Sequence, residues 1–365
     1  MSNPYLSRAR LKGYRNIRDT EATFENGLNI IIGPNGCGKS NFLWLLGHID
    51  SEKINDLDVK GNIEYYYKGN LVRTNITFEF NQHYNFNIKR NIESEILNHT
   101  NKKDSKNIEE VIKNSSSLFL KYCYLPFNVP SEIECFSTPT TTSYLIVEGL
   151  NSLINFNSNK NLILTNLINL SDWLKEDIMI QDFQIDQKYI DTLKKYTPIE
   201  NIQVEYPIRE DEIKVEKGYN NNKVTVSNLM YGFKTKNEWF KWNELSDGTR
   251  RMVWIVLSVL ATNNVVLLEE PELGIHPHQL QLLMEFLKEQ SAEKQIIITT
   301  HAPEVLNILD ENELSRIKLA RYDETLKSTV IESVSEKKQA AIKKYFAKTG
   351  LLSSYWVNIG LENKK

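Results

Sequence analysis

The apolar residues of this chain follow two patterns that predict β-strands. Residues 5–11 alternate between apolar and polar side chains, which is typical of a strand with one buried face. Residues 27–32, 264–268 and 295–300 are instead short, nearly continuous apolar runs. Runs of this kind are typical of strands that are buried on both faces of a parallel sheet.

Three segments near these runs have the apolar pattern of helices. They are residues 40–46, 252–261 and 277–290. Strands that alternate with helices in this way predict a parallel sheet covered by helices on both faces. The pattern therefore predicts the α/β fold class.

The middle of the chain has a different pattern. Strand-like segments at 62–67 and 71–80 are followed by a polar stretch, 98–107, that predicts a loop. Residues 108–200 are predicted to be largely helical, because an apolar stripe runs through residues 162–173. Strands are predicted again near residues 202–208, 212–216 and 223–233.

Composition and charge exclude several classes of protein. Among 365 residues, 44 lysines and arginines face 47 aspartates and glutamates, so a nucleic-acid partner would require a local basic patch. No stretch approaches the ~20 consecutive apolar residues of a membrane-spanning helix, and the first residues do not resemble a signal peptide. Three cysteines cannot form a disulfide framework. We therefore expect a cytoplasmic protein without a membrane partner.

The strongest motif lies at residues 33–40, which read Gly-Pro-Asn-Gly-Cys-Gly-Lys-Ser. A buried strand precedes it and a helix follows it, which is the context of a phosphate-binding loop. Its glycines let backbone N–H groups surround phosphate oxygens, and the helix N-terminus adds a positive dipole end. Lys39 would reach the β- and γ-phosphates, and the Ser40 hydroxyl would hold Mg²⁺. Cys37 is interpreted as a small residue that fills a position in the loop.

Two further signals follow buried strands. Glu269 and Glu270 end one strand, and His301 ends another. Ligands of α/β proteins bind at the carboxyl ends of parallel strands. We therefore predict that Glu269 orients Mg²⁺, that Glu270 polarises an attacking water, and that His301 contacts a γ-phosphate. Adjacent glutamates or a single histidine are weak signals alone. They become informative here because the same chain also has a phosphate-binding loop.

The fourth motif directly precedes the apolar helix at 252–261. Residues 244–251 read Glu-Leu-Ser-Asp-Gly-Thr-Arg-Arg, so Ser246 or Asp247 can cap that helix. A capped helix N-terminus is also an anion site, so the two interpretations are compatible.

In this order, the four motifs resemble those of the ATP-binding-cassette (ABC) ATPases of the RecF, SMC and OLD type. The phosphate loop and the carboxylate strand match Walker A and Walker B, Leu245–Thr249 matches the signature motif, and His301 matches the switch histidine. Residues 13–17 resemble the start of these proteins, where Arg15 would lie near the nucleotide base.

Residues 269–277, which read Glu-Glu-Pro-Glu-Leu-Gly-Ile-His-Pro, are similar to the stand-alone, OLD-like branch. Similar stand-alone ATPases occur in bacterial anti-phage defence operons. Most other cassette ATPases have aspartate where this chain has Glu269, which keeps a carboxylate but changes its reach toward Mg²⁺.

The resemblance implies a discontinuous P-loop NTPase head of the ABC type. Residues 1–95 and 200–365 would form this head, with a parallel sheet flanked by helices and an antiparallel β subdomain. Residues 96–199 would form an inserted, mainly helical lobe, because the heptads of an SMC coiled coil are missing.

The resemblance also implies an ATPase that converts ATP and water to ADP and phosphate, with Mg²⁺ as cofactor. Two heads would dimerise head to tail around two ATP molecules, with higher oligomers possible. Catalysis would use Glu270, His301 and Lys39, and Mg²⁺ would be held by Ser40 and Glu269, with Gln82 as the candidate metal-sensing glutamine. ATP would contact Arg15, Asn16, Asn35, Gly36, Cys37, Gly38, Lys39, Ser40 and Asn41, and in trans Ser246, Asp247 and Gly248.

Three functions stay open at this stage. The first is an ATPase that senses a trigger and controls a separately encoded nuclease or toxin, since the few residues after His301 leave no room for an effector domain. The second is a RecF- or SMC-like clamp that binds DNA for repair. The third is a non-catalytic scaffold that binds ATP as a structural ligand for a partner protein.

Overall fold

The computed structural model forms two compact units, which are described separately. The first consists of Met1–Tyr124, Thr262–Leu273 and Met284–Lys365, and the second of Leu125–Ala261 and Gly274–Leu283. The structure describes residues 5–49, 54, 58–67, 70–80, 86–95, 120–123, 133–137, 144–146, 154–156, 183–185, 187–205, 213–217, 222–226, 230–261 and 265–359.

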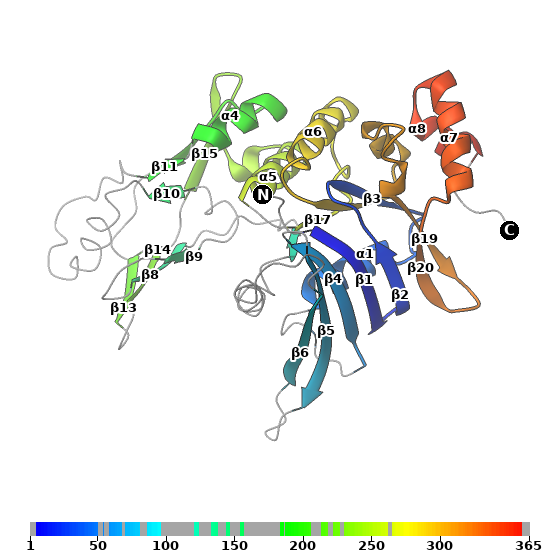
Figure 1. Ribbon diagram of the computed structural model, residues 1–365. Helices are drawn as coiled ribbons and strands as arrows, with labels where there is room; N and C mark the ends of the chain where they lie inside the picture. Colours follow the sequence, from blue (N-terminus) through cyan, green and yellow to red (C-terminus); the bar gives the residue numbers. More distant parts are fainter. Residues whose placement is uncertain are drawn as a thin grey trace, which may run out of the picture. The chain divides into compact units, whose positions relative to one another are not determined.

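A six-stranded sheet is the centre of the first unit (Figure 1). Five neighbouring strands are parallel and β20 pairs antiparallel with β19 at one edge. Every residue of β3 and β18 is buried, as predicted for strands covered on both faces. The strand order is β20 (Ser328–Ser333), β19 (Ile317–Asp323), β3 (Leu28–Ile32), β18 (Ile296–Thr300), β17 (Val265–Glu269) and β7 (Leu120–Cys123).

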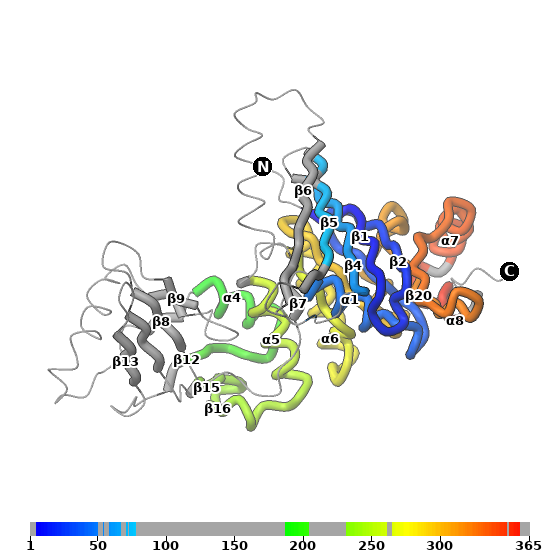
Figure 2. Tube along the Cα trace, turned by 90° about the horizontal axis from the view of Figure 1, so that it is seen from below, coloured from blue at the N-terminus to red at the C-terminus, as the bar shows by residue number. Residues whose placement is uncertain are grey.

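An antiparallel sheet of five strands forms the second layer of this unit. In β1, Leu6, Ala9 and Leu11 are buried, and an irregularity between Leu6 and Arg8 interrupts the alternation. The predicted strands at 62–67 and 71–80 are confirmed as β4 and β5. The order is β2 (Ile17–Thr23), β1 (Tyr5–Tyr14), β4 (Lys60–Tyr67), β5 (Asn70–Phe80) and β6 (Phe86–Glu95). Figure 2 shows β2, β1, β4 and β5 side by side.

Helix α1 (Lys39–His48) packs against both sheets. It contacts β1 and β2 of the antiparallel sheet and β7, β17 and β18 of the parallel sheet. Phe42, Leu45 and Leu46 are fully buried in one core with residues of both sheets. This core fixes the start of α1 beside the end of β3, which is the position required of a phosphate loop.

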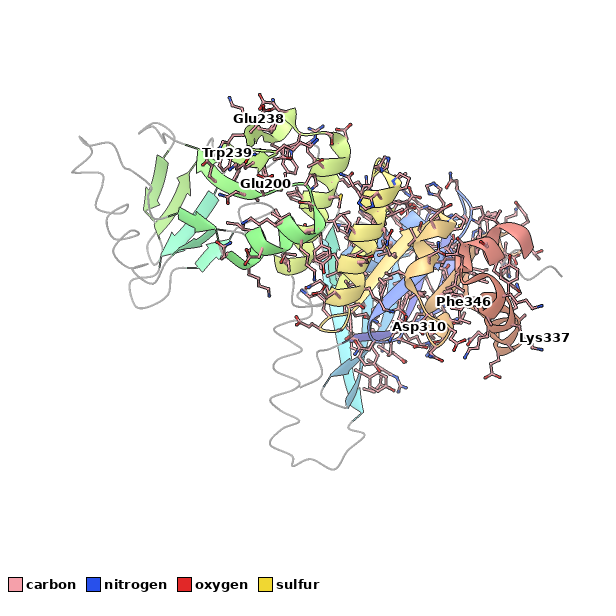
Figure 3. All side chains as sticks on the ribbon, turned by 90° about the horizontal axis from the view of Figure 1, so that it is seen from above. Glu200, Glu238, Trp239, Asp310, Lys337 and Phe346 are labelled. Carbon is pink, nitrogen blue, oxygen red and sulfur yellow. The ribbon has the colours of Figure 1, made fainter. Side chains whose placement is uncertain are left out.

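The C-terminal part of the first unit consists of short helices around the sheet edge. Lys337, in the first turn of α7, is exposed, and Phe346 is half-buried (Figure 3). No helix in the described ranges has the length and apolar character needed to cross a membrane. The elements are α6 (Pro277–Gln290), whose second half belongs to this unit, η6 (Pro303–Ile308), η7 (Leu314–Arg316), α7 (Glu336–Thr349) and α8 (Leu352–Ile359).

Within the described residues, the second unit contains three small antiparallel sheets, the helices α4 and α5, and the first half of α6. Helix α5 (Asp247–Ala261) confirms the apolar helix predicted at 252–261 and begins at the signature-like motif. Trp239 on β16 is 41% exposed (Figure 3). The other elements are β8 (Ile133–Ser137), β9 (Tyr144–Ile146), β10 (Ile154–Phe156), β11 (Phe183–Ile185), α4 (Gln187–Tyr196), β12 (Asn201–Glu205), β13 (Ile213–Lys217), β14 (Asn222–Val226), β15 (Met230–Thr235), β16 (Glu238–Lys241) and η5 (Trp242–Glu244).

The predicted fold class is confirmed: this is an α/β P-loop fold with an added antiparallel sheet. The mainly helical insertion expected at 96–199 stays a prediction, because the structure describes only short stretches of this range. There, β7 to β11 are strands and α4 is a helix. The predicted stripe at 162–173 and the predicted loop at 98–107 lie outside the described residues. The boundaries of the insertion stay a prediction.

Candidate active site

Three neighbouring parallel strands end at one edge of the central sheet. Strand β3 leads into the phosphate loop, β18 leads to His301, and β17 ends at Glu269. Strand β18 lies between the other two, so β3 and β17 are roughly 10 Å apart. Because parallel strands point the same way, the three predicted groups gather at the same sheet edge.

The glycines of the phosphate loop are required by its packing. A Cβ atom on Gly33 would lie 2.1 Å from the backbone oxygen of Ala320 in β19. Gly38 has a left-handed φ of 100°, and a Cβ there would lie 2.0 Å from Thr329 Oγ1. Any other residue at these two positions would displace the loop from the sheet.

Helix α1 begins without a side-chain cap. Gly38 occupies the N-cap position and has no side chain that could accept a hydrogen bond from the first turn. Lys39 is buried and donates to the backbone oxygens of Gly33 (2.8 Å) and Pro34 (3.0 Å), while Ser40 is exposed. The backbone N–H groups and the lysine therefore suit a phosphate anion.

A hydrogen-bonded brace connects this loop to distant parts of the first unit. Thr329 of β20 is fully buried and donates from Oγ1 to the backbone oxygen of Cys37 at 2.8 Å. The Thr329 N–H donates to the backbone oxygen of Asn16. The amide of Asn41 in α1 donates to Asn16 Oδ1 (2.7 Å) and accepts from Arg15 Nη1 (3.0 Å). The brace joins four predicted ATP-contact residues, Arg15, Asn16, Cys37 and Asn41.

The carboxylate end of β17 is strained. Glu270 has a left-handed φ of 41°, and its N–H donates to the backbone oxygen of Thr299 at 2.8 Å. A left-handed conformation costs a residue other than glycine about 1 kcal/mol or more, and such residues cluster at functional sites. Arg15, with φ of 49°, is another predicted site residue in this conformation. The others in the described chain, Lys236, Asn237 and Lys327, lie in turns between antiparallel strands.

Glu270 and His301 are in contact. His301 Nδ1 lies 3.3 Å from Glu270 Oε1, so the predicted base and the predicted switch histidine form a pair. The two residues come from neighbouring strands, β17 and β18, which pair in parallel register from Val266 to Glu269.

The signature-like motif lies in the second unit, at the start of α5. Ser246 Oγ accepts a hydrogen bond from the Thr249 N–H at 3.3 Å, which confirms the predicted helix cap. Asp247 is exposed and forms an ion pair with Arg250, and Gly248 is buried. Gln82, the candidate metal-sensing residue, lies outside the described residues. Asn35 and Gly36 are exposed in the phosphate loop, whereas Cys37 is buried.

Three residues of this site were not predicted from the sequence. They are Thr329 in the brace, and Glu272 and Thr300, which hydrogen-bond to each other beside His301. A threonine in an edge strand carries no motif, so only the fold places Thr329 at the loop. Glu272 belongs to the Glu-Glu-Pro-Glu run, and its position after Glu270 is the signal that could have singled it out.

Ser40 and Glu269 could supply two oxygen ligands to a metal ion. No group of three or more histidine, cysteine, aspartate or glutamate side chains is gathered as a metal site within the described ranges. Two protein oxygens fit Mg²⁺, which keeps several waters and takes further oxygens from the phosphates of its nucleotide.

A comparison with known families identifies this arrangement. Residues 28–307 match the family described as "AAA domain, putative AbiEii toxin, Type IV TA system", which is well over half of the chain. The chain belongs to this family. It is therefore a P-loop ATPase family member of the ABC type, in the RecF and SMC class, as the motif order indicated.

Individual relatives agree with this assignment. The AAA-domain chain is 30% identical to an uncharacterized ABC transporter ATP-binding protein of Methanocaldococcus jannaschii, over 34% of this chain and 42% of that protein. It is 52% identical to the DNA replication and repair protein RecF of Magnetococcus marinus, over 12% of this chain and 11% of RecF. The chain therefore spans less than half the length of these relatives.

The fold agrees with a solved structure as well. An Smc head bound to the C-winged helix domain of ScpA superposes with a TM-score of 0.51 at 13% identity. The match covers 92% of this chain and 99% of the Smc head. At this identity the likeness supports the fold alone.

Proposed function

We propose that this protein binds ATP with Mg²⁺ and hydrolyses it to ADP and phosphate. The observation that carries the proposal is the sheet edge where β3, β18 and β17 end. There, an uncapped helix N-terminus with Lys39 shares one edge with the Glu270–His301 pair. A phosphate site and a paired acid–base group at one edge suit phosphoryl transfer to water.

Each residue has a role that its position supports. The N–H groups at the start of α1 and the Lys39 ammonium hold the β- and γ-phosphates, and Ser40 and Glu269 hold Mg²⁺, which neutralises phosphate charge. Glu270 accepts a hydrogen bond from the attacking water. His301, which contacts Glu270, donates toward the γ-phosphate.

The active form in this proposal is a head-to-tail dimer. The start of α5, with Ser246, Asp247 and Gly248, would contact the γ-phosphate bound by the partner subunit. Ser246 already caps its own helix, so the remaining N–H groups of that turn are the donors offered in trans. ATP then stabilises the dimer, and hydrolysis releases it.

The biological role in this proposal is control of a separately encoded effector, a nuclease or a toxin, in anti-phage defence. The family description, which names a putative toxin and a toxin–antitoxin system, supports this role. A head of the same fold has been solved bound to a separate chain, ScpA, which supports a partner protein. DNA is the alternative trigger or ligand, and salt-dependent DNA binding by the ATP-bound dimer would favour it.

Glu270→Gln tests the catalytic proposal. This variant should bind ATP with unchanged affinity and lose about 100-fold or more in turnover, because the amide cannot accept a proton from water. With ATP it should accumulate as a dimer, measured by light scattering after size-exclusion chromatography. Glu324→Gln, an exposed glutamate of the turn between β19 and β20, is the matched control and should behave as wild type.

Two results would overturn parts of the proposal. Wild-type turnover in Glu270→Gln would remove Glu270 from catalysis. Stable ATP binding without phosphate release in the wild type would instead favour the scaffold function.

A further inference from the structure

Glu272 is a buried acid beside the proposed catalytic pair. It lies in the turn after β17, and only 8% of its surface is exposed. Its Oε1 accepts hydrogen bonds from Thr300 Oγ1 (2.5 Å) and from the backbone N–H of His301 (3.3 Å). The same oxygen lies 3.7 Å from His301 Nδ1. One carboxylate oxygen thus contacts the backbone and the ring edge of the histidine.

Two carboxylates therefore face the same nitrogen of His301. Glu270 Oε1 lies 3.3 Å from Nδ1 and Glu272 Oε1 lies 3.7 Å from it. Nδ1 is thus the ring nitrogen turned toward the two acids, and Nε2 lies on the other side of the imidazole. Glu272 differs from Glu270 because it also holds the peptide N–H of the histidine and the preceding hydroxyl.

The cost of burying Glu272 indicates that it does more than fill space. Its second oxygen, Oε2, is buried and has no hydrogen-bond partner among the described residues. A buried carboxylate with an unsatisfied oxygen destabilises a fold, and a residue of similar shape without the charge would be less costly. Such groups are retained where a site uses them.

We propose that Glu272 is the positioning residue of His301. By accepting from the Thr300 hydroxyl and the His301 N–H, it fixes the turn after β18 and keeps the imidazole edge toward Glu270. Nε2 then stays aimed away from both acids for the γ-phosphate contact, so the role rests on the ATPase function proposed above.

Steady-state kinetics of three variants test this role. Glu272→Ala should lower kcat about 10- to 100-fold while the KM for ATP changes less than about threefold, because positioning acts on the reaction step. Glu272→Gln keeps an amide oxygen that can accept from Thr300 and His301, so it should retain much of the wild-type kcat. Glu285→Ala, an exposed glutamate of α6, is the matched control.

A double variant separates positioning from stability. If Glu272 acts through His301, Glu272→Ala should have little further effect on kcat in a His301→Ala background. A multiplicative loss of kcat in the double variant would overturn the proposal. So would a Glu272→Gln variant as inactive as Glu272→Ala, since the charge itself would then act in the reaction.

A measurement without turnover distinguishes this inference from the ATPase proposal. In protein with ¹⁵N-labelled histidines, the His301 ring signals can be assigned by their loss in His301→Ala. Glu272→Ala should shift or broaden these signals, and Glu272→Gln should restore them. Unchanged His301 signals in Glu272→Ala would overturn the inference. If the signals shift as expected but the wild-type protein releases no phosphate from ATP, only the ATPase proposal is overturned.

Discussion

The two glycine-containing helix starts of this protein differ in how their first turns are satisfied. Helix α1 begins at Gly38 with no side-chain cap, whereas Ser246 caps the first turn of α5. An uncapped start leaves its N–H groups for a ligand, and a capped start is stable without one. The comparison indicates that α1 is built to bind an anion within its own subunit. The first turn of α5 is satisfied within its own chain by Ser246.

Gly38→Ala tests whether the uncapped start of α1 binds the nucleotide, and we expect it to have the largest effect on ATP affinity. Its Cβ would lie 2.0 Å from Thr329 Oγ1 at a left-handed φ, so the loop must move. We expect a loss of about 2–3 kcal/mol in stability and about 100-fold or more in ATP affinity, measured by calorimetry. Gly350→Ala is the matched control, because Gly350 also has positive φ and no atom within 4 Å of its Cβ position, but it lies at the end of α7, outside the predicted site.

The second half of the comparison is tested by Ser246→Asp. Aspartate is also a good helix cap, so α5 should remain stable, but its negative charge would oppose the phosphate of the partner subunit. We expect ATP affinity of the monomer to stay unchanged while ATP-driven dimerisation and turnover fall roughly 100-fold. Ser246→Thr keeps the hydroxyl and should resemble wild type. If Ser246→Asp dimerises normally with ATP, α5 does not bind nucleotide in trans.

Thr329→Val tests whether the brace contributes to ATP binding at the start of α1, and we expect a smaller loss of ATP affinity than in the two variants above. Valine has nearly the shape of threonine but cannot donate to the Cys37 backbone oxygen, so one buried hydrogen bond is lost. The loss should be about 1 kcal/mol, or roughly fivefold in ATP affinity, with a similar loss of stability. Thr325→Val, at an exposed site in the turn between β19 and β20, should change neither quantity. Unchanged ATP affinity in Thr329→Val would show that the brace does not hold the phosphate loop in its ATP-binding conformation.

The sequence predicts the parts of the site that are local, and the fold supplies the rest. Walker A and the Glu269–Glu270 pair each follow a strand that is buried on both faces, so a continuous apolar run and its end suffice to locate them. The brace cannot be found this way, because Thr329 and Cys37 are 292 residues apart and meet only through β20 and β19.

The insertion gave a weaker signal. The helices expected in 108–200 rested on the apolar stripe at 162–173, which lies outside the described residues. In the described parts, Tyr144–Ile146 and Ile154–Phe156 are strands of three residues, too short for alternation to be recognised.

We expect the smallest effect on ATP binding for Lys318→Met. This variant should change the stability of the sheet without changing ATP affinity. Lys318 on β19 is buried and donates to the Ser315 backbone oxygen (2.6 Å) and to Ser333 Oγ (2.9 Å). Burial lowers the pKa of this lysine to about 8. The folded state therefore binds its proton less tightly than the unfolded state, so the charged lysine destabilises the fold below about pH 8.

This cost should disappear as the pH rises from about 8 toward the ordinary lysine pKa of about 10.5, because the unfolded chain then also loses the proton. Lys318→Met should accordingly raise stability by about 1–3 kcal/mol near pH 7, offset in part by the two lost hydrogen bonds, and by less near pH 10. Denaturant unfolding at the two pH values measures the difference, and ATP affinity near pH 7 should not change. A stability gain that is equal at both pH values would mean that the buried charge is not its source. A change in ATP affinity would mean that Lys318 on β19 also influences the phosphate loop.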